Sequence, residues 1–489
     1  MGINPLDRRG VATAGTPLPL FGADAGQRVA RETTQERTQE ATLGSLIDDM
    51  PVGTLHRFVV WVVGIGLFFD MYEIFLVSSI GSALQHDFGI ARQSADFKLL
   101  LASAFIGMFF GSLCLGSLAD RIGRRKAFVF CLVWYSAFSL LGALSVNADM
   151  LVLCRFLTGI GVGAIYPVSD SYLSEILPKE RRGRLAAWAY TVSYVAVPLV
   201  GFLAVWLNTL QIGSVAGWRL ILAVGGVGGI FVLFVQHRLP ESPRWLLARG
   251  RFDEAQNQLR RFADSAGAKL PAVIASEPAT PHAMGLAEHI AVLRQAPYDK
   301  RFLMLVVFHL FQCFGYYGFG TLASLVVKSR GFDVTASTLF MALSFLGYPA
   351  GSLLSIPLLN WLERRTLVIT SILSIAVFGF GFAYSEDTIL IVVFGVLTTC
   401  ASNVFSNAYH VYQAEIFPAR VRSTAIGSTY ALSRIMSGAL PFLLLPVLNG
   451  YGAGAMFGVI STALVIVAVT VRVLGPLTTR RSQDEINPV

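Results

Sequence analysis

Long apolar stretches separated by short polar loops make up the chain from about residue 57 to residue 474. A helix needs about 20 predominantly apolar residues to cross the hydrocarbon core of a membrane. Twelve stretches have this length, and we expect each of them to be a transmembrane helix. They cover residues 57–84, 97–119, 127–146, 150–173, 184–208, 217–236, 301–327, 335–359, 366–385, 387–412, 422–448 and 453–474. The pattern predicts an all-α membrane protein.

A set of residues recurs 240 positions further along the chain. The matched pairs are Gly107–Gly347, Gly111–Gly351, Ser112–Ser352, Arg124–Arg364, Arg125–Arg365, Glu175–Glu415, Ile176–Ile416, Pro178–Pro418, Tyr190–Tyr430, Ser193–Ser433 and Leu203–Leu443. One constant offset across several segments indicates two parallel repeats, as in transporters that rock about a central site. We therefore expect two pseudo-symmetric six-helix halves, residues 51–236 and 301–475, in which glycines four apart allow close helix packing.

Basic residues are distributed unevenly between the short loops. Loops after even-numbered spans carry Arg121, Arg124, Arg125, Lys126, Lys179, Arg181, Arg182, Arg184, Arg364 and Arg365. Loops after odd-numbered spans carry only Arg92, Lys98, Lys328 and Arg330. Because cytoplasmic loops are enriched in Lys and Arg, both termini are predicted to be cytoplasmic.

Three polar segments flank or join the halves. Residues 1–50 have few large apolar groups and are predicted to be a disordered cytoplasmic tail, with Leu46–Pro51 as a short interfacial lead-in. Residues 237–300 are predicted to be a cytoplasmic linker. It contains an amphipathic stretch, Leu246–Phe262, and a flexible insert, Pro271–His282. Residues 476–489 form a second cytoplasmic tail.

Composition excludes several functions. The chain is 54% hydrophobic and 14% charged, whereas soluble domains average about 25% charged residues. A net charge of +8 is compatible with nucleic-acid binding, but the basic residues lie in short loops, where they set topology. All five cysteines fall in apolar segments, which favours buried thiols over disulfides or a metal site. With no phosphate-binding loop or nucleophilic triad, we expect no cofactor, no metal and no enzymatic activity.

Several motifs carry a family resemblance. Residues 116–126 (GSLADRIGRRK) resemble the loop signature of the major facilitator superfamily, and residues 155–163 (RFLTGIGVG) resemble its fourth-span signature. Residues 240–245 (PESPRW) resemble the sugar-porter and metabolite-symporter branches. The likeness covers roughly residues 50–475 and implies the major facilitator fold.

Two further motifs point to a branch of that superfamily. Phe69-Asp70-Met71-Tyr72-Glu73 is similar to the Asp-Gly-x-Asp pattern of aromatic-acid and nicotinate proton symporters, although Met71 and Glu73 depart from it. Residues 430–434 (YALSR) resemble the eleventh-span Arg pattern of the same symporters. Sugar porters carry paired glutamines in span seven, whereas this chain has the single Gln312. The resemblance implies proton-coupled transport of a small organic acid.

Acidic side chains inside the spans are candidates for proton coupling. An ionisable group at the bilayer centre costs at least ~3 kcal/mol and usually has a role. Asp70 and Glu73 lie three residues apart on one face of the first span, and two nearby carboxylates in a low dielectric do not both ionise readily. We expect this pair to bind the coupled proton. The alternative is that Asp70 caps or pairs with a neighbouring helix while Glu73 faces a vestibule. Asp170 is a candidate for proton relay or for pairing near the gate.

Two arginines inside the spans are candidates for substrate binding. Arg434 lies at nearly the depth of Asp70, and a guanidinium there can hold a carboxylate through two parallel hydrogen bonds. A fixed intramembrane ion pair is the alternative. Its repeat partner is Tyr194, so the site is expected to be asymmetric. Arg155 is predicted near the depth of Asp70, where it pairs with that residue or binds backbone carbonyls.

Other residues complete the expected site. Polar and aromatic side chains at span centres, each alternatively a packing residue, are Tyr166, Tyr190, Tyr194, Gln312, Tyr316, Tyr317, Asn403 and Asn407. The family resemblance implies that charged residues at the cytoplasmic helix ends close an inner gate; the alternative is that they are solvated loop charges. The expected gate residues are Asp120, Arg121, Arg124, Glu175, Arg181, Arg182, Glu415 and Arg422. His309 and His410 are interpreted as core or interfacial residues that are also able to titrate.

The sequence thus predicts a multi-pass protein of the plasma membrane, the inner membrane in a bacterium. We expect a monomer that takes up a small organic anion with protons by alternating access. A sugar or polyol carrier is the alternative within transport, and a membrane sensor that binds without moving its ligand is the alternative outside it.

Overall fold

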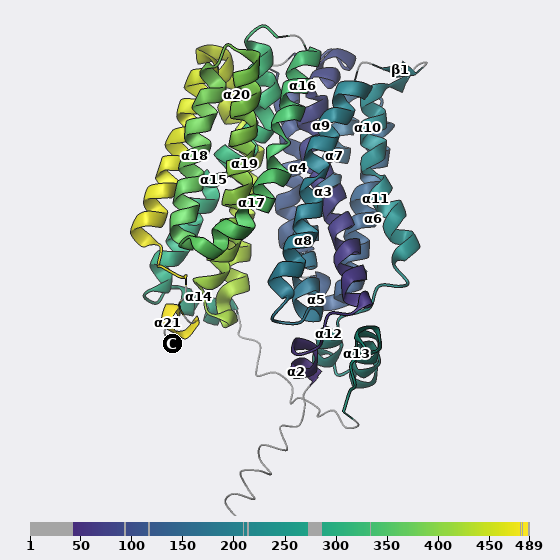
Figure 1. Cartoon of the computed structure of the whole chain (residues 1–489). Helices are drawn as coiled ribbons and strands as arrows, with labels where there is room; N and C mark the ends of the chain where they lie inside the picture. The colour runs from purple at the N-terminus through teal and green to yellow at the C-terminus, as the bar shows by residue number, and fades with distance from the viewer. Residues whose placement is uncertain are drawn as a thin grey trace, which may run out of the picture.

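The computed structural model describes residues 43–487 except 92–93, 116–117, 209, 213–214, 272–285, 333, 480 and 482. Long helices run side by side through the molecule (Figure 1). They are α3 (Thr54–Asp87), α4 (Ala95–Cys114), α6 (Arg124–Ala143), α7 (Ala148–Ile176), α8 (Arg182–Tyr194) with α9 (Ala196–Leu207), α10 (Gly217–Gly225) with α11 (Val227–Val235), α15 (Tyr298–Ser329), α16 (Val334–Ser344) with α17 (Gly347–Trp361), α18 (Arg364–Tyr384), α19 (Thr388–Glu415) and α20 (Ala419–Leu474).

These helices account for the twelve predicted spans. Eleven stretches are long and apolar enough to cross a membrane, and the last of them, Thr424–Leu474, contains two spans. The two spans meet at Gly452, whose φ of 83° and ψ of 179° break the helix. A residue with a side chain rarely adopts such a positive φ, so glycine makes the turn possible. The break between α8 and α9 has a different cause, because Pro198 has no N–H to donate to the carbonyl of Tyr194.

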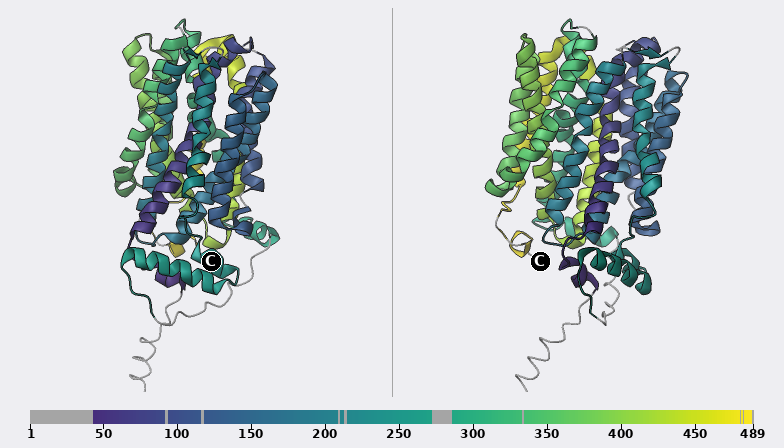
Figure 2. Two further views of the ribbon diagram at one scale, coloured as in Figure 1. Left: turned by 90° about the vertical axis from the view of Figure 1, so that its right-hand side faces the viewer. Right: turned by 45° about the vertical axis from the view of Figure 1, so that its right-hand side comes forward.

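Short elements lie at the two ends of the bundle. The helices α2 (Leu43–Asp48), α12 (Pro243–Ala248), α13 (Phe252–Ala266), α14 (Leu286–Leu293) and α21 (Gln483–Ile486) gather at the end that we call the linker end (Figure 1). Figure 2 shows α13 lying across this end of the bundle. A two-stranded antiparallel hairpin, β1 (Gln211–Ile212) and β2 (Val215–Ala216), marks the opposite end, which we call the far end. The short helix α5 (Leu118–Ile122) follows α4 near the linker end.

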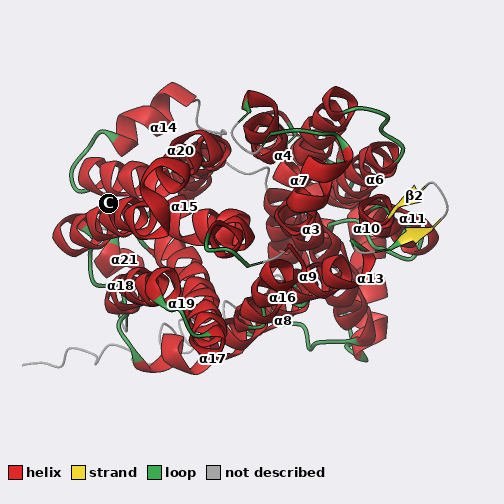
Figure 3. Ribbon diagram, turned by 90° about the horizontal axis from the view of Figure 1, so that it is seen from above, coloured by secondary structure: helices red, strands yellow, loops and turns green. Residues whose placement is uncertain are grey.

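The helices form two groups, α3–α11 and α15–α20, seen side by side from above (Figure 3). Their internal packing repeats at the predicted offset. A Cβ added to Gly107 would overlap the backbone oxygen of Phe156, and one added to Gly347 would overlap that of Val396, 240 residues after Phe156. Likewise Gly111 packs on Ile160 as Gly351 packs on Cys400. Close backbone approach at small residues, as expected for helices in lipid, therefore occurs at equivalent places in both halves.

The polar contacts at the linker end repeat as well. Arg124 and Glu175 form an ion pair of 2.7 Å, and the equivalent Arg364 and Glu415 form one of the same length. Arg182 donates to the carbonyl oxygen of Leu177 at 3.2 Å, just as Arg422 donates to that of Phe417. Each of these contacts joins residues of one half, so they hold the loop ends of that half together.

The predicted tails and linker are partly ordered. Residues 43–48, which we expected within a disordered tail whose end from Leu46 is a short lead-in, form α2, and its Leu43 and Ile47 are buried. Asp48 fixes this helix by ion pairs with Arg182 (2.9 Å) and Arg244 (2.8 Å). The rest of the predicted disordered tail, residues 1–42, and most of the predicted flexible insert lie outside the described residues. The predicted amphipathic stretch is two helices, α12 and α13, because Gly250 turns the chain with a φ of 70°.

The second tail also packs against the bundle. Arg301 is buried and donates to the carbonyl oxygens of Ile416 (2.8 Å) and Ile486 (2.7 Å) and to the amide oxygen of Asn487 (3.0 Å). The start of the tail is held by Glu363, which accepts from the backbone N–H of Thr478 at 2.9 Å. The described part of residues 476–489 is thus attached to the C-terminal half.

Candidate functional site

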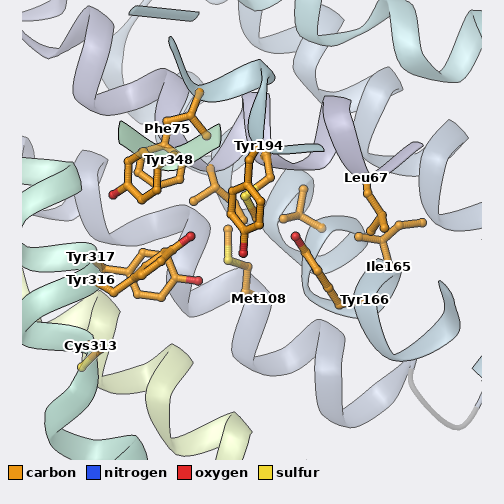
Figure 4. Close-up of a cluster of buried hydrophobic side chains, with 14 of the residues drawn as sticks. Leu67, Phe75, Met108, Ile165, Tyr166, Tyr194, Cys313, Tyr316, Tyr317 and Tyr348 are labelled. Atoms are coloured by element: carbon orange, nitrogen blue, oxygen red, sulfur yellow. The ribbon is translucent and has the colours of Figure 1, made fainter. Parts of the chain in front are cut away.

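A pocket lies between the two halves, midway along the long helices. About 360 Å³ of space not occupied by atoms lies within it, counting the part open to solvent. The N-terminal half contributes Met71, Tyr166 and Tyr194, and the C-terminal half contributes Gln312, Tyr316, Tyr317, Ser406, Tyr409, His410, Tyr430 and Arg434. Figure 4 shows the rings of Tyr166, Tyr194, Tyr316 and Tyr317 converging near Met108. The lining is aromatic, with hydroxyl, amide, imidazole and guanidinium groups interspersed.

Arg434 is the cation of this pocket. Its side chain is 2% exposed, and its guanidinium donates to the hydroxyls of Tyr317 (2.6 Å) and Tyr430 (2.8 Å). It also lies over both rings, 5.5 Å from the centre of Tyr317 and 4.9 Å from that of Tyr430. Its Nε has no hydrogen-bond partner, and no carboxylate among the described residues lies within 4.0 Å of the guanidinium. Tyrosines solvate the charge without neutralising it, so the pocket is suited to an anion.

Asp70 lies near this cation without contacting it. Its side chain is fully buried in α3, and neither carboxylate oxygen has a hydrogen-bond partner among the described residues. Arg434 and Glu73 both act on it electrostatically, Arg434 attractively and Glu73 repulsively. An unpaired, desolvated carboxylate is costly as an anion and much less costly when protonated. The surroundings therefore allow Asp70 to carry a proton.

Of the two roles expected for Arg155, pairing with Asp70 is wrong, because its partner is Glu73, whereas binding to a backbone carbonyl is found. Its Nη1 lies 2.5 Å from Glu73 Oε2, and its Nη2 donates to the backbone oxygen of Glu73 at 2.8 Å. Ser139 donates to the other carboxylate oxygen at 2.5 Å. The group is buried between α3, α6 and α7 inside the N-terminal half. Side chains three residues apart on an α-helix point in directions that differ by about 60° around its axis. Glu73 therefore points toward α7, where it meets Arg155, and Asp70 does not.

Aromatic side chains block the pocket toward the far end. Phe75 packs against Phe345, Tyr348 and Tyr316 at ring distances of 5.4, 5.2 and 6.4 Å. All four are buried, and they come from both halves. Further along α3, Ser78 accepts a hydrogen bond of 3.3 Å from Ser324. The halves are therefore closed against each other on this side.

On the linker-end side, the pocket residue Tyr166 contacts Tyr190, which in turn contacts Asp170. The rings of Tyr166 and Tyr190 stack with their centres 6.0 Å apart. The hydroxyl of Tyr190 donates to Asp170, whose side chain is exposed. A polar path thus leads from the pocket wall to an exposed carboxylate.

The expected substrate residues separate into two groups. Tyr166, Tyr194, Gln312, Tyr316 and Arg434 line the pocket. Asn403 and Asn407 instead join α19 to α17, through bonds to the Tyr348 carbonyl (2.5 Å) and to Ser355 (2.7 Å). Polar groups on helix surfaces that face a neighbouring helix serve packing there.

Sequence analysis missed four lining residues, Met71, Ser406, Tyr409 and Tyr430. Tyr430 was available as the repeat partner of Tyr190, and it lies one helical turn before Arg434, on the same face. Tyr409 and Ser406 had no comparable signal, because many tyrosines and serines lie in these spans.

In the described part of the chain, the expected gate residues do not form one network across the two halves. Arg124 joins Asp120 (2.6 Å) to Glu175, and Glu175 accepts from Ser242 at 2.5 Å. Glu415 pairs with Arg364 in the other half. Arg121 and Arg181 are exposed. The ion pairs found among these residues link helices of one half, so in this conformation they brace each half.

A second polar group extends from the pocket into the C-terminal half. The amide of Gln413 bridges two imidazoles, with Oε1 3.1 Å from His309 Nε2 and Nε2 3.2 Å from His410 Nδ1. His309 is fully buried, whereas His410 lines the pocket. Among the described residues, no cluster of three or more His, Cys, Asp or Glu side chains has the geometry to hold a metal ion.

The fold of two helix bundles around a central pocket is typical of a membrane transporter, and the comparisons agree. The family model for "Sugar (and other) transporter" matches residues 59–489. The chain therefore belongs to this family, within the major facilitator superfamily, and is an integral multi-pass membrane transporter, not an enzyme.

The chain is similar in sequence to several curated transport proteins. The chain is 31% identical over 79% of its length to the putative metabolite transport protein YyaJ of Bacillus subtilis, covering 85% of that protein. It is 28% identical over 91% of its length to the niacin transporter NiaP of Acinetobacter baylyi, covering 99% of that protein. It is 31% identical over 57% of its length to the 4-hydroxybenzoate transporter PcaK of Pseudomonas aeruginosa, covering 56% of that protein.

Solved structures support the fold. The xylose transporter XylE of E. coli, in a partially occluded inward-open conformation, matches 87% of this chain and 99% of its own with a TM-score of 0.69. Sequence identity is 19%, so this likeness concerns architecture alone.

Proposed function

We propose that the protein takes up a small aromatic carboxylate together with a proton by alternating access. The observation that carries this proposal is the buried guanidinium of Arg434, which lines the pocket between the halves and has no carboxylate partner within 4.0 Å among the described residues. A desolvated cation needs a counter-charge. A substrate carboxylate supplies it through charge-assisted hydrogen bonds, while the tyrosines accommodate an apolar ring.

Coupling follows from the second charge nearby. When Asp70 is ionised, it partly balances Arg434 and disfavours a second anion. When Asp70 is protonated, Arg434 keeps its full attraction for the substrate carboxylate. Proton and anion therefore bind together and leave together, and the halves rearrange around a site with little net charge. The hydrogen-bonded pair of Tyr190 and the exposed Asp170 relays the proton between Asp70 and the linker end.

The relatives agree with this substrate class. Niacin and 4-hydroxybenzoate, named for two of them, are both aromatic monocarboxylates. We propose that both termini are cytoplasmic, so that the linker end faces the cytoplasm and the aromatic cluster of Phe75 closes the site on the opposite side. We place the protein as a monomer in the plasma membrane, the inner membrane in a bacterium.

Flux measurements in proteoliposomes test the proposal. Labelled benzoate, pyridine-3-carboxylate and 4-hydroxybenzoate are offered with and without an imposed pH gradient, acidic outside. We expect at least one of them to accumulate only when the gradient is present, and a protonophore to abolish the accumulation. Uptake of hexoses or pentoses with no uptake of these acids would assign the protein to the sugar carriers. Binding without net flux would make it a sensor.

A further inference from the structure

The tautomer of His410 is determined by a residue outside the pocket. Gln413 is buried and lies between His410 and His309, and its amide makes one hydrogen bond to each imidazole. An amide has one acceptor and one donor end, so the two imidazoles must present opposite partners to it. Whichever nitrogen of His309 carries the hydrogen thereby decides which nitrogen of His410 carries its own.

Burial of His309 selects one of the two arrangements. His309 Nδ1 is buried and has no hydrogen-bond partner among the described residues. If the hydrogen were on Nδ1, an N–H donor would be buried unpaired, a situation that folded proteins rarely tolerate. The hydrogen therefore belongs on Nε2, where Gln413 Oε1 accepts it at 3.1 Å. Gln413 then donates to His410 Nδ1, and the hydrogen of neutral His410 is on Nε2.

His410 is also held in place and kept neutral. Tyr409 stacks on its ring, with centres 4.3 Å apart, and Tyr430 lies 6.1 Å away. Arg434 lies over the same Tyr430 ring at 4.9 Å. A second positive charge beside this buried guanidinium is unfavourable. The pocket thus presents a guanidinium and an uncharged imidazole N–H on two sides of one tyrosine.

We propose that His410 is a specificity-determining residue that donates Nε2–H to the substrate ring, so that the preferred aromatic carboxylate carries a hydrogen-bond acceptor such as a pyridine nitrogen. This inference rests on the proposed function, because Arg434 must hold the carboxylate. Benzoate fills the same space but leaves the His410 donor unpaired. A site built to hydrogen-bond a substrate discriminates strongly against an analogue that lacks the partner. Gln413 and His309 act as positioning residues.

Matched substrates test this in proteoliposomes of the full-length protein near neutral pH, where the pyridine nitrogen is unprotonated. We compare kcat/KM for benzoate with those for pyridine-3-carboxylate and pyridine-4-carboxylate, which differ from it by one ring atom. The wild type is expected to prefer one of the pyridine acids by about tenfold or more. Because this is a ratio within one sample, differences in the amount of active protein between variants cancel.

Three variants locate the donor. His410→Phe keeps a flat ring without a donor and should reduce the preference about tenfold. His410→Gln places an amide N–H near the position of Nε2 and should retain most of it, whereas His410→Asn places one near Nδ1 and should not. Gln413→Leu releases the tautomer and should also reduce the ratio.

The outcomes separate the two proposals. Equal wild-type transport of benzoate and both pyridine acids overturns the inference about His410 and leaves the proposed function standing. A wild-type preference that survives in His410→Phe also overturns it, since another group must then be the donor. If the wild type transports none of the three acids, the inference about His410 fails, and the proposed function fails with it when 4-hydroxybenzoate is not transported either.

Discussion

Arg155 in the N-terminal half and Arg434 in the C-terminal half are both 2% exposed, but their charges are balanced in different ways. Arg155 has a carboxylate at 2.5 Å, and that carboxylate also accepts from Ser139. Arg434 has two phenol hydroxyls and an acid that acts on it only from a distance. Among the described residues the Nε of both arginines lacks a hydrogen-bond partner, so the contrast lies in the carboxylate. The first is a closed ion pair inside one half, and the second is an open cation between the halves.

The difference shows what distinguishes a structural charge from a functional one in lipid. A buried cation that already has a carboxylate partner has no need of a ligand, and breaking such a pair is costly. A buried cation without a counter-ion gains from any anion that reaches it. Depth in the membrane does not separate the two, because both arginines lie well inside spans. The partners separate them, and three substitutions test this comparison.

The largest effect is expected on stability, from Arg155→Leu. This variant leaves Glu73 buried without its cation, which should destabilise the protein by about 3–5 kcal/mol. The double variant Arg155→Leu/Glu73→Leu should recover most of the loss, because no uncompensated charge remains. Thermal unfolding of purified protein in detergent measures this. Arg434→Leu is the matched control and should lose much less stability. If it loses as much, the two arginines are equally structural and the comparison is wrong.

The next effect is expected on transport, from Arg434→Lys. Lysine keeps the charge but lacks the planar fork that grips a carboxylate with two hydrogen bonds. A hydrogen bond to a charged group is worth about 1.5–3 kcal/mol, so kcat/KM for the transported acid should fall by about a hundredfold. Arg155→Lys, which alters a cation outside the pocket, should change kcat/KM by less than about fivefold. If both substitutions reduced kcat/KM to a similar extent, the interpretation of Arg434 as a substrate-binding cation and of Arg155 as a structural one would be wrong.

The smallest effect is expected on accumulation, from Asp70→Asn. A pH gradient of one unit supplies about 1.4 kcal/mol per proton, enough for roughly tenfold accumulation. Asparagine cannot release a proton, so this variant should equilibrate substrate without accumulating it while still exchanging labelled for unlabelled substrate. Glu73→Gln alters the acid that is paired with Arg155. This variant should be less stable, but the protein that remains folded should still accumulate substrate in response to the pH gradient. Full accumulation by Asp70→Asn would remove Asp70 from the coupling step.

Local patterns were enough to predict the framework. The twelve spans follow from the length of apolar runs, and α20 was divided correctly at about residue 450 because the glycine-containing turn interrupts its hydropathy. The offset of 240 residues made Arg364 and Glu415 the equivalents of Arg124 and Glu175, and the structure pairs the arginine with the glutamate in both halves. The same patterns placed Asp70, Glu73 and Arg434 inside the membrane.

Tertiary structure decided which of these charges meet. Asp70 and Glu73 share a helix face by spacing, but a rotation of about 60° between them is enough to give Glu73 to Arg155 and to leave Asp70 unpaired. The sequence alone does not predict how α3 is rotated about its axis relative to the neighbouring helices. The bridge from His309 through Gln413 to His410 likewise depends on how α15 packs on α19. The number of helices that cross the membrane and the charges they carry follow from local sequence, because hydropathy acts residue by residue. Which charged side chain has no ion-pair partner, and can therefore bind a substrate, depends on how the helices pack. An ion pair forms only when the two groups lie within a few ångströms of each other, and sequence spacing does not give such distances.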